Sequence, residues 1–148
     1  MLFYLNALVV FAVDQFLKHL VHKFMHFGQS IPLFTDIVRL TYVRNTGAAF
    51  SLFVGFSPYL AVVGVVVALG VVYFHYRIPA NNYLLQIGLS CLLGGSIGNL
   101  ADRLVRSYVI DYIDITIWPV FNFADVMINV GVLFIALNYL RSPDEGKT

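Results

Sequence analysis

Four apolar segments, each close to the length that crosses a bilayer, are the feature that most constrains how this chain folds. They cover residues 2–24, 59–76, 83–101 and 125–140, and a membrane-spanning helix needs roughly 20 apolar residues. Only 11% of the residues are charged, whereas soluble domains average about 25%. We therefore expect an all-α membrane protein with four transmembrane helices, and the length favours a single domain over 1–148.

The stretch between the first two helices, about 25–57, has a different pattern. Residues 37–43 are rich in β-branched side chains and partly alternate, which favours short strands lying at the membrane surface. Asn45, Thr46 and Gly47 are typical of a turn. The sequence thus predicts a small β-rich segment between helices 1 and 2.

Charged and polar residues inside the spans occur in groups. Asp14 and Lys18 are four residues apart and share one helix face; because a buried lone charge is costly, we expect them to pair. Asn99, Asp102 and Arg103 also share a face. For both groups a structural ion pair or helix-end network is favoured over a proton relay or direct catalysis. A stripe of small residues on the third helix favours close helix packing: Ser90, Gly94 and Gly98.

Asp111 and Asp125 flank the connection that enters the last helix. An ionisable group near hydrocarbon marks function by default, and two carboxylates brought together can share a proton and act as acid and base. If the run around Asp111 is extended, Asp114 points to the opposite face. Asn122 is a candidate N-cap that makes Asp125 the third helical residue, so a simple helix-start acid is the competing interpretation.

Several other chemistries are not predicted. A net charge of +1 suggests no polyanion, so no nucleic acid partner is expected. His19, His22 and His26 share a helix face, but no further ligand accompanies them, and interfacial side chains are favoured over a metal site. The sequence contains no nucleophile elbow, zinc motif or phosphate loop, and we predict neither a metal nor a cofactor.

Five short motifs in order along the chain resemble those of one family, the lipoprotein signal peptidases, which are the type II signal peptidases of bacteria. Residues 14–18 resemble the family's first-helix motif, and residues 45–51 resemble its NxGAAFS segment. Residues 98–103 resemble GNxxDR, residues 109–111 stand where the family carries its first catalytic aspartate, and residues 121–125 resemble FNxAD. Their order between four hydrophobic spans makes the resemblance specific.

The resemblance implies a role for each matching residue. Asp111 and Asp125 would be the catalytic aspartates. Five residues would bind substrate or support the pair: Asn45, Gly47, Asn99, Arg103 and Asn122. Asp14, Lys18 and Asp102 would be structural.

The resemblance also implies substrate, inhibitor and location. The substrate would be a prolipoprotein, cleaved before a diacylglyceryl-modified cysteine, with membrane lipids as partners and inhibition by cyclic peptide antibiotics of the globomycin type. The protein would lie in the bacterial cytoplasmic (inner) membrane with both termini cytoplasmic, its β-rich segment extracytoplasmic and its site facing the outer leaflet. A simple count of basic residues gives the opposite orientation, unless Lys18, Arg44 and Arg103 have internal partners.

Two other classes of function compete with a peptidase. Buried Asp, Lys and Asn side chains also occur in small channels and proton-linked transporters, but here they cluster at the ends of the spans. A non-catalytic lipid-binding or assembly protein would tolerate Asn at positions 111 and 125, whereas a protease would not. The GxGD motif of other intramembrane aspartyl proteases is absent.

Overall fold

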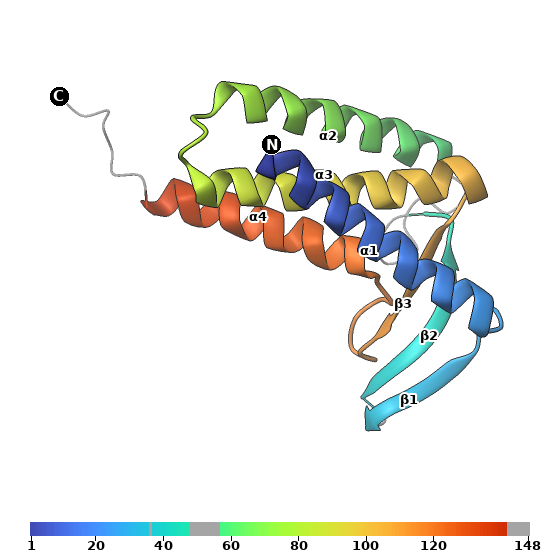
Figure 1. The fold of residues 1–148 in the computed structure, drawn as a ribbon. Coiled ribbons are helices and arrows are strands. Elements are labelled where there is room, and N and C mark those ends of the chain that lie inside the picture. Colours follow the sequence, from blue (N-terminus) through green and yellow to red (C-terminus); the bar gives the residue numbers. More distant parts are fainter. Residues whose placement is uncertain (36, 48–56, 142–148) are drawn as a thin grey trace.

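The computed structural model describes residues 1–35, 37–47 and 57–141, and Figure 1 shows its helices gathered into a bundle with a small sheet at one end. All four helices are long and apolar enough to cross a membrane, which confirms the predicted fold class. The elements in chain order are α1 (Leu2–Phe24), β1 (Ser30–Thr35), β2 (Val38–Asn45), α2 (Ser57–Arg77), α3 (Tyr83–Arg106), β3 (Val109–Asp114) and α4 (Phe123–Arg141).

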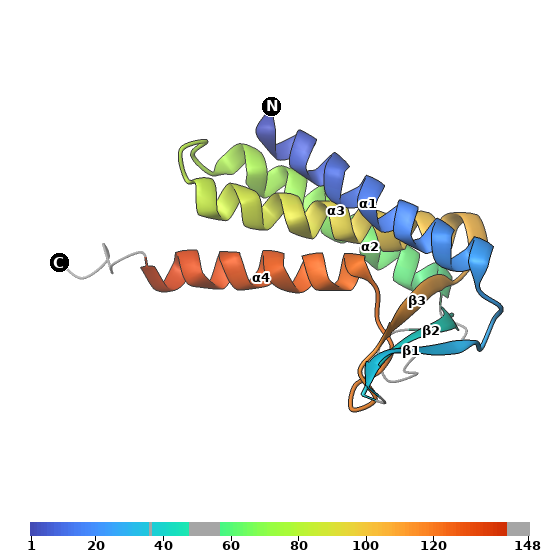
Figure 2. The ribbon, with the colours of Figure 1, turned by 60° about the horizontal axis from the view of Figure 1, so that its bottom comes forward.

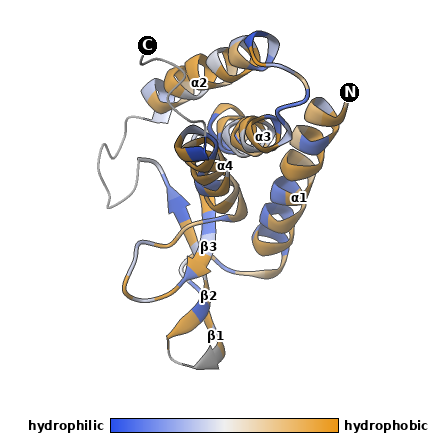
Figure 3. Cartoon of the chain, turned by 90° about the vertical axis from the view of Figure 1, so that its left-hand side faces the viewer, coloured by the Kyte–Doolittle hydropathy of each residue, from blue (hydrophilic) through white to orange (hydrophobic). Residues whose placement is uncertain are grey.

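Helix α3 is the centre of the bundle. It packs against α1, α2 and α4, and Figure 3 shows it surrounded by the other three helices. In the apolar 18-residue stretch of α3, 61% of the residues are buried, compared with 17% in the corresponding stretch of α2. Apolar side chains on the outer faces of the helices remain exposed, as expected for surfaces that lie against lipid.

Small residues allow α1 and α4 to approach α3 closely. A Cβ atom on Gly94 would lie 2.6 Å from the carbonyl oxygen of Ala7, and one on Gly95 would lie 2.5 Å from that of Ala124. Backbones at this distance leave no room for a side chain. The packing role predicted for the stripe of small residues is thus confirmed at Gly94, and it extends to Gly95 on the α4 side.

The sheet is antiparallel with strand order β1-β2-β3. Its third strand comes from the connection between α3 and α4, so the strands are not confined to the predicted segment between the first two helices. The added strand covers an edge of β2 that would otherwise be unpaired, with Val43 opposite Asp111. Ile110 and Tyr112 also bury their side chains against Val21 near the end of α1. Figure 2 shows the sheet lying beyond the end of the bundle.

Helix ends differ from the limits of the apolar segments. Helix α3 runs past the predicted 101 to Arg106 and stops at Ser107, whose φ of 66° is left-handed and whose N–H bonds the carbonyl of Arg103. Helices α2 and α4 begin at 57 and 123, each slightly before its predicted start. Hydropathy marks where lipid-compatible side chains lie, whereas the helix continues until its backbone bonds end.

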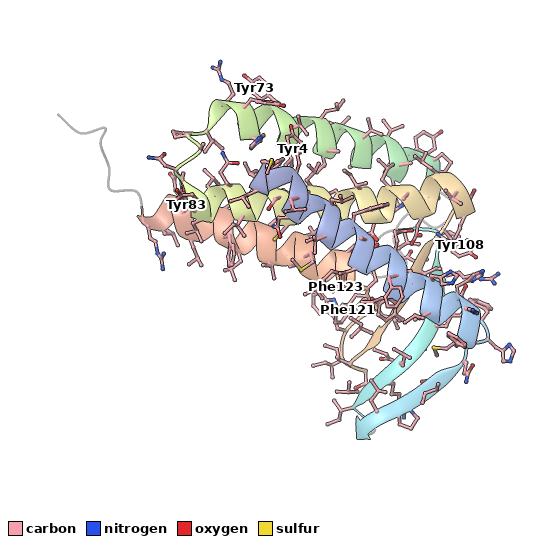
Figure 4. The ribbon with its side chains drawn as sticks, viewed as in Figure 1. Tyr4, Tyr73, Tyr83, Tyr108, Phe121 and Phe123 are labelled. Atoms are coloured by element: carbon pink, nitrogen blue, oxygen red, sulfur yellow. The ribbon has the colours of Figure 1, made fainter. Side chains whose placement is uncertain are left out.

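Aromatic side chains mark both ends of the bundle. Figure 4 shows Tyr4, Tyr73 and Tyr83 at the end away from the sheet, and Tyr108 where α3 ends. Tyr and Trp are enriched where membrane meets water, so tyrosines at both ends of the bundle agree with four helices that are long and apolar enough to cross a membrane.

Candidate active site

Strand β3 directs Asp111 into the junction between the sheet and the bundle. The side chain is only 2% exposed. The amide Nδ2 of Asn45, from the neighbouring strand, donates to its Oδ2 at 2.9 Å, and Nδ2 of Asn122 donates to its Oδ1 at 2.6 Å. Asp114 bonds Thr41 instead, at 2.8 Å. The predicted divergence of the two acids is confirmed.

Asp125 occupies the first turn of α4. Its backbone N–H donates to Oδ1 of Asn122 at 3.0 Å, and its own Oδ2 accepts the backbone N–H of Asn122 at 3.2 Å. This reciprocal arrangement caps the helix start and confirms Asn122 as the N-cap. Nδ2 of Asn99, from α3, donates to the other carboxylate oxygen at 2.8 Å.

Asn122 therefore connects the two aspartates. The side chain is fully buried; its Nδ2 donates to Asp111, while its Oδ1 accepts the backbone N–H of Asp125. The same residue thus begins a helix and bridges two carboxylates from different elements. The two interpretations of Asp125, a helix-start acid and a member of an acid pair, describe one arrangement.

A cavity of about 670 Å³ opens beside the pair. Asp111 and Asp125 both line it, together with Asn45, Asn99 and Arg103, so both aspartates and three of the five residues assigned to substrate binding or support converge here. Most of its other lining residues are apolar: Val109, Ile115, Trp118, Pro119, Val120, Phe121 and Val126. Figure 4 shows Phe121 and Phe123 at the same junction of α4 and sheet. The cavity suits a ligand that is mostly apolar but carries polar groups at one place.

The environment of Asp111 favours its protonated form. Burial, followed by the charge of Asp125, raises the pKa of Asp111 to about 7, although the hydrogen bonds from Asn45 and Asn122 and the charge of Lys18 oppose the rise. A buried carboxylate beside a second one loses hydration and meets repulsion, and both effects penalise ionisation. Near neutral pH, Asp111 can therefore hold a proton or release it.

Arg103 contacts the turn at the end of β2. Its Nη2 donates to the carbonyl of Gly47 at 3.2 Å, and the predicted turn is confirmed by the bond from the N–H of Gly47 to Oδ1 of Asn45 at 2.9 Å. Among the described residues, Nε of Arg103 is buried and has no hydrogen-bond partner. Residues 48–51 of the NxGAAFS-like motif lie outside the described residues.

Behind the cavity, three buried charges form a cluster between α1 and α3. Nζ of Lys18 lies 2.8 Å from Oδ2 of Asp14 and 3.1 Å from Oδ2 of Asp102. The predicted pairing of Asp14 with Lys18 is confirmed, and Asp102 belongs to the same network. Asp102 has a second cation, Arg106, whose Nη1 lies 2.6 Å from its Oδ1; sequence reasoning missed this partner although the four-residue spacing indicates it.

Tyr112 is a second residue that the sequence did not single out. Its phenol oxygen accepts the backbone N–H of Phe123 at 3.3 Å, at the start of α4. Burial raises the pKa of Tyr112, so its hydroxyl stays protonated. Its signal was an aromatic residue next to Asp111 in an alternating strand, which by itself indicates only packing.

Four spans and two bridged carboxylates that line one cavity define the class: a membrane aspartic peptidase. Residues 6–141 match the model of the family described as signal peptidase (SPase) II. The chain belongs to this family.

Individual relatives agree over nearly the whole chain. A lipoprotein signal peptidase of Desulfitobacterium hafniense is 41% identical over 150 residues, covering 100% of this chain and 99% of its own. That of Bacillus subtilis is 40% identical over 151 residues, covering 99% and 97%. A solved structure described as a bacterial membrane enzyme aligns with a TM-score of 0.89 at 29% identity, covering 97% of this chain and 90% of its own.

Proposed function

We propose that Asp111 and Asp125 are the catalytic pair of this signal peptidase, which removes the signal peptide of prolipoproteins by cleaving before a diacylglyceryl-modified cysteine. The observation that carries the proposal is the bridge through Asn122, which bonds one carboxylate and caps the helix of the other. Both aspartates line the same cavity. A paired acid and base beside a cavity can activate a water molecule and protonate the scissile carbonyl without a covalent intermediate.

In the proposed mechanism Asp125 is the base and Asp111 the acid. Asp125 accepts hydrogen bonds on both oxygens from Asn99 and Asn122 and lies in the first turn of α4, which suits it to receive a proton from water. Asp111 has the raised pKa and holds a proton near neutral pH. The pair thus starts each turnover with one negative charge and one proton.

The reaction balances with one water molecule. The water oxygen attacks the scissile carbonyl carbon while Asp125 takes a water proton, and Asp111 transfers its proton to the carbonyl oxygen. When the C–N bond breaks, the proton on Asp125 goes to the leaving amine nitrogen. In the same collapse, one hydroxyl of the gem-diol that the attack formed returns its proton to Asp111, so the new carboxyl group forms and the pair regains its starting state.

The surroundings of the pair suit the polar part of the proposed substrate. Nε of Arg103 is a buried donor without a partner among the described residues, and an unmade bond of this kind is costly unless a ligand supplies an acceptor. We assign Arg103 to a substrate carbonyl. Asn45, Gly47, Asn99 and Asn122 hold the aspartates and Arg103 in place.

The apolar lining of the cavity suits the rest of the substrate. Its apolar residues would contact the part of the signal peptide and of the diacylglyceryl group nearest the scissile bond, while the remainder of both would lie in membrane lipid. A cyclic peptide antibiotic of the globomycin type would inhibit by occupying the same space.

We further propose that the termini are cytoplasmic and that the site faces the outer leaflet of the bacterial inner membrane. The start of α1 and the end of α4 lie away from the sheet in Figure 1. Lys18 is paired with Asp14 and Asp102, Arg103 donates to the carbonyl of Gly47, and the exposed Arg44 lies over the ring of Tyr42 at 5.7 Å. Lys18 therefore does not count as a free basic residue on that face, which weakens the charge count that argued for the reverse orientation.

The test is cleavage of a diacylglyceryl-modified prolipoprotein by the purified protein, followed by mass measurement of the product. We expect cleavage before the lipidated cysteine, and a loss on the order of 10⁴-fold in kcat for Asp111→Asn and for Asp125→Asn. Asp114→Asn is the matched control, because this acid lies on the same strand but bonds Thr41. It should retain wild-type activity. Activity that survives in either of the first two folded variants contradicts the assignment.

A further inference from the structure

The start of the helix that carries Asp125 is held by a carboxylate from another helix. Oδ1 of Asp14, in α1, accepts the backbone N–H of Ala124 at 3.0 Å. Ala124 is fully buried and immediately precedes Asp125. Asp14 does not line the cavity, yet it sets where the chain turns into α4.

The strand that carries Asp111 is held in the same way. Oδ2 of Asp102, in α3, accepts the backbone N–H of Ile110 at 3.2 Å. Ile110 is fully buried and immediately precedes Asp111. Each aspartate of the catalytic pair therefore follows a backbone amide that is bonded to a buried carboxylate outside the cavity.

Lys18 joins these two carboxylates and reaches the pair by a third route. An ammonium group has three donors, and Nζ of Lys18 contacts Asp14 at 2.8 Å, Asp102 at 3.1 Å and Oδ1 of Asn99 at 2.9 Å. Because this contact holds the oxygen of the Asn99 amide, its Nδ2 faces Asp125, to which it donates at 2.8 Å. Lys18 is fully buried, so no solvent competes for these bonds.

We propose that Lys18, Asp14 and Asp102 form a positioning cluster that sets the separation and orientation of the two catalytic carboxylates, an inference that rests on the proposed function. The cluster touches the backbone before each aspartate and the amide that orients one of them. A displacement of about 1 Å in such a pair costs on the order of 100-fold in rate. Rigid support of this kind is what a two-carboxylate site on separate elements requires.

The same two helices show that holding α1 against α3 does not need ions. At the other end of their contact, Nδ2 of Asn6 donates to Oγ of Ser90 at 2.6 Å. A buried ion pair is also weak evidence for stability, because apolar replacements are often as stable. We therefore attribute the buried charges of Lys18, Asp14 and Asp102 to the positioning of the two aspartates and not to the packing of α1 against α3.

The experiment measures kcat and KM per folded molecule of the full-length protein on a diacylglyceryl-modified prolipoprotein. We expect Lys18→Arg to lower kcat about tenfold with KM unchanged, because a planar guanidinium cannot make the same three contacts. Lys18→Met should lower kcat about 100-fold. If Lys18→Met does not fold, the Lys18→Arg result decides the matter.

A pH profile separates positioning from mere support of the fold. The charged groups that face Asp111 are Asp125, Lys18 and Arg103, and the charge of Lys18 lowers the pKa of Asp111. Lys18→Met should therefore move the alkaline limb of kcat to higher pH, whereas Lys18→Arg, which keeps the charge, should leave it in place.

Ser90→Ala is the matched control, since it removes a bond between the same two helices far from the pair. It should keep the wild-type kcat per folded molecule. A wild-type kcat in folded Lys18→Arg and Lys18→Met, with only thermal stability reduced, overturns the proposed positioning. Failure of the proposed function looks different: the wild type does not cleave, or Asp111→Asn and Asp125→Asn remain active.

Discussion

The two ends of the helix bundle both bury polar side chains, but they use different chemistry. At the end away from the sheet the contacts join amide, hydroxyl and imidazole groups, as in Asn6 with Ser90 and His75 with Gln86 at 2.6 Å. At the sheet end they join carboxylates to an ammonium and to backbone amides, as around Lys18. The first set lines a cavity of about 740 Å³ in whose lining the described residues place no Asp or Glu, while the second lies behind the cavity that holds the two aspartates.

Buried polar side chains inside a membrane bundle are therefore not by themselves a sign of catalysis. Polar groups in lipid must find partners wherever they occur, and the bonds around Ser90 meet that need. What distinguishes the sheet end is that two carboxylates and Arg103, from three elements, line one cavity, whereas the lining of the cavity at the other end contains no Asp or Glu among the described residues. Function is indicated by this convergence, and the proposed activity can be tested against the other end of the molecule.

The largest expected effect on kcat concerns two asparagine N-caps, one at each end of the helix bundle. Asn82 caps α3 by accepting the N–H of Leu85 at 3.3 Å, and Asn122 caps α4 while bonding Asp111. Losing either cap costs about 1 kcal/mol of stability. We expect Asn122→Ala to lower kcat by about 100-fold as well, because Asp111 loses the amide that holds its carboxylate and the helix start that carries Asp125 loses its side-chain cap.

The measurement is kcat per folded molecule beside thermal unfolding of each variant in detergent. Asn82→Ala is the control and should lose stability without losing kcat. Equal kcat in the two variants would contradict a catalytic role for Asn122, because this residue would then serve only as a helix cap.

An intermediate effect concerns the pH dependence of the sheet end. Because the pKa of Asp111 is raised to about 7, the acid keeps its proton below that pH and loses it above. We expect kcat to fall about tenfold per pH unit on the alkaline side. The hydrogen bond from Asn45 lowers this pKa, so Asn45→Ala should move the limb to higher pH.

The check is a rate profile across neutral and alkaline pH for the wild type and two variants. Thr41→Val, on the same strand but bonded to Asp114, should leave the limb where it is. A limb that moves to lower pH in Asn45→Ala would mean that another group controls it.

The smallest expected effect lies between the two ends, where α1 and α3 touch. A Cβ atom at Gly94 would lie 2.7 Å from Cβ of Val10, so Gly94→Ala should destabilise the protein by about 1–3 kcal/mol. Gly70→Ala is the control, because a Cβ there meets nothing within 4 Å among the described residues. Thermal unfolding compares them; equal stability would contradict close packing of these helices.

Four properties were predictable from the amino-acid sequence: the membrane class, the four spans, the family resemblance and the pairing of Asp14 with Lys18. These properties depend on local composition and helical spacing, which a linear chain displays directly. The N-cap role of Asn122 was also readable, because capping involves residues three apart.

Contacts between segments that lie far apart in the sequence could be seen only in the folded protein. The third strand required an open edge on β2, and the end of α3 depended on backbone bonding that hydropathy does not record. The contacts of Asp14 with Ala124 and of Asp102 with Ile110 join separate elements, and no local pattern encodes them. The environment of Asp111 was equally hidden, because burial and the nearby charge of Asp125 arise only when the helices and the sheet pack together.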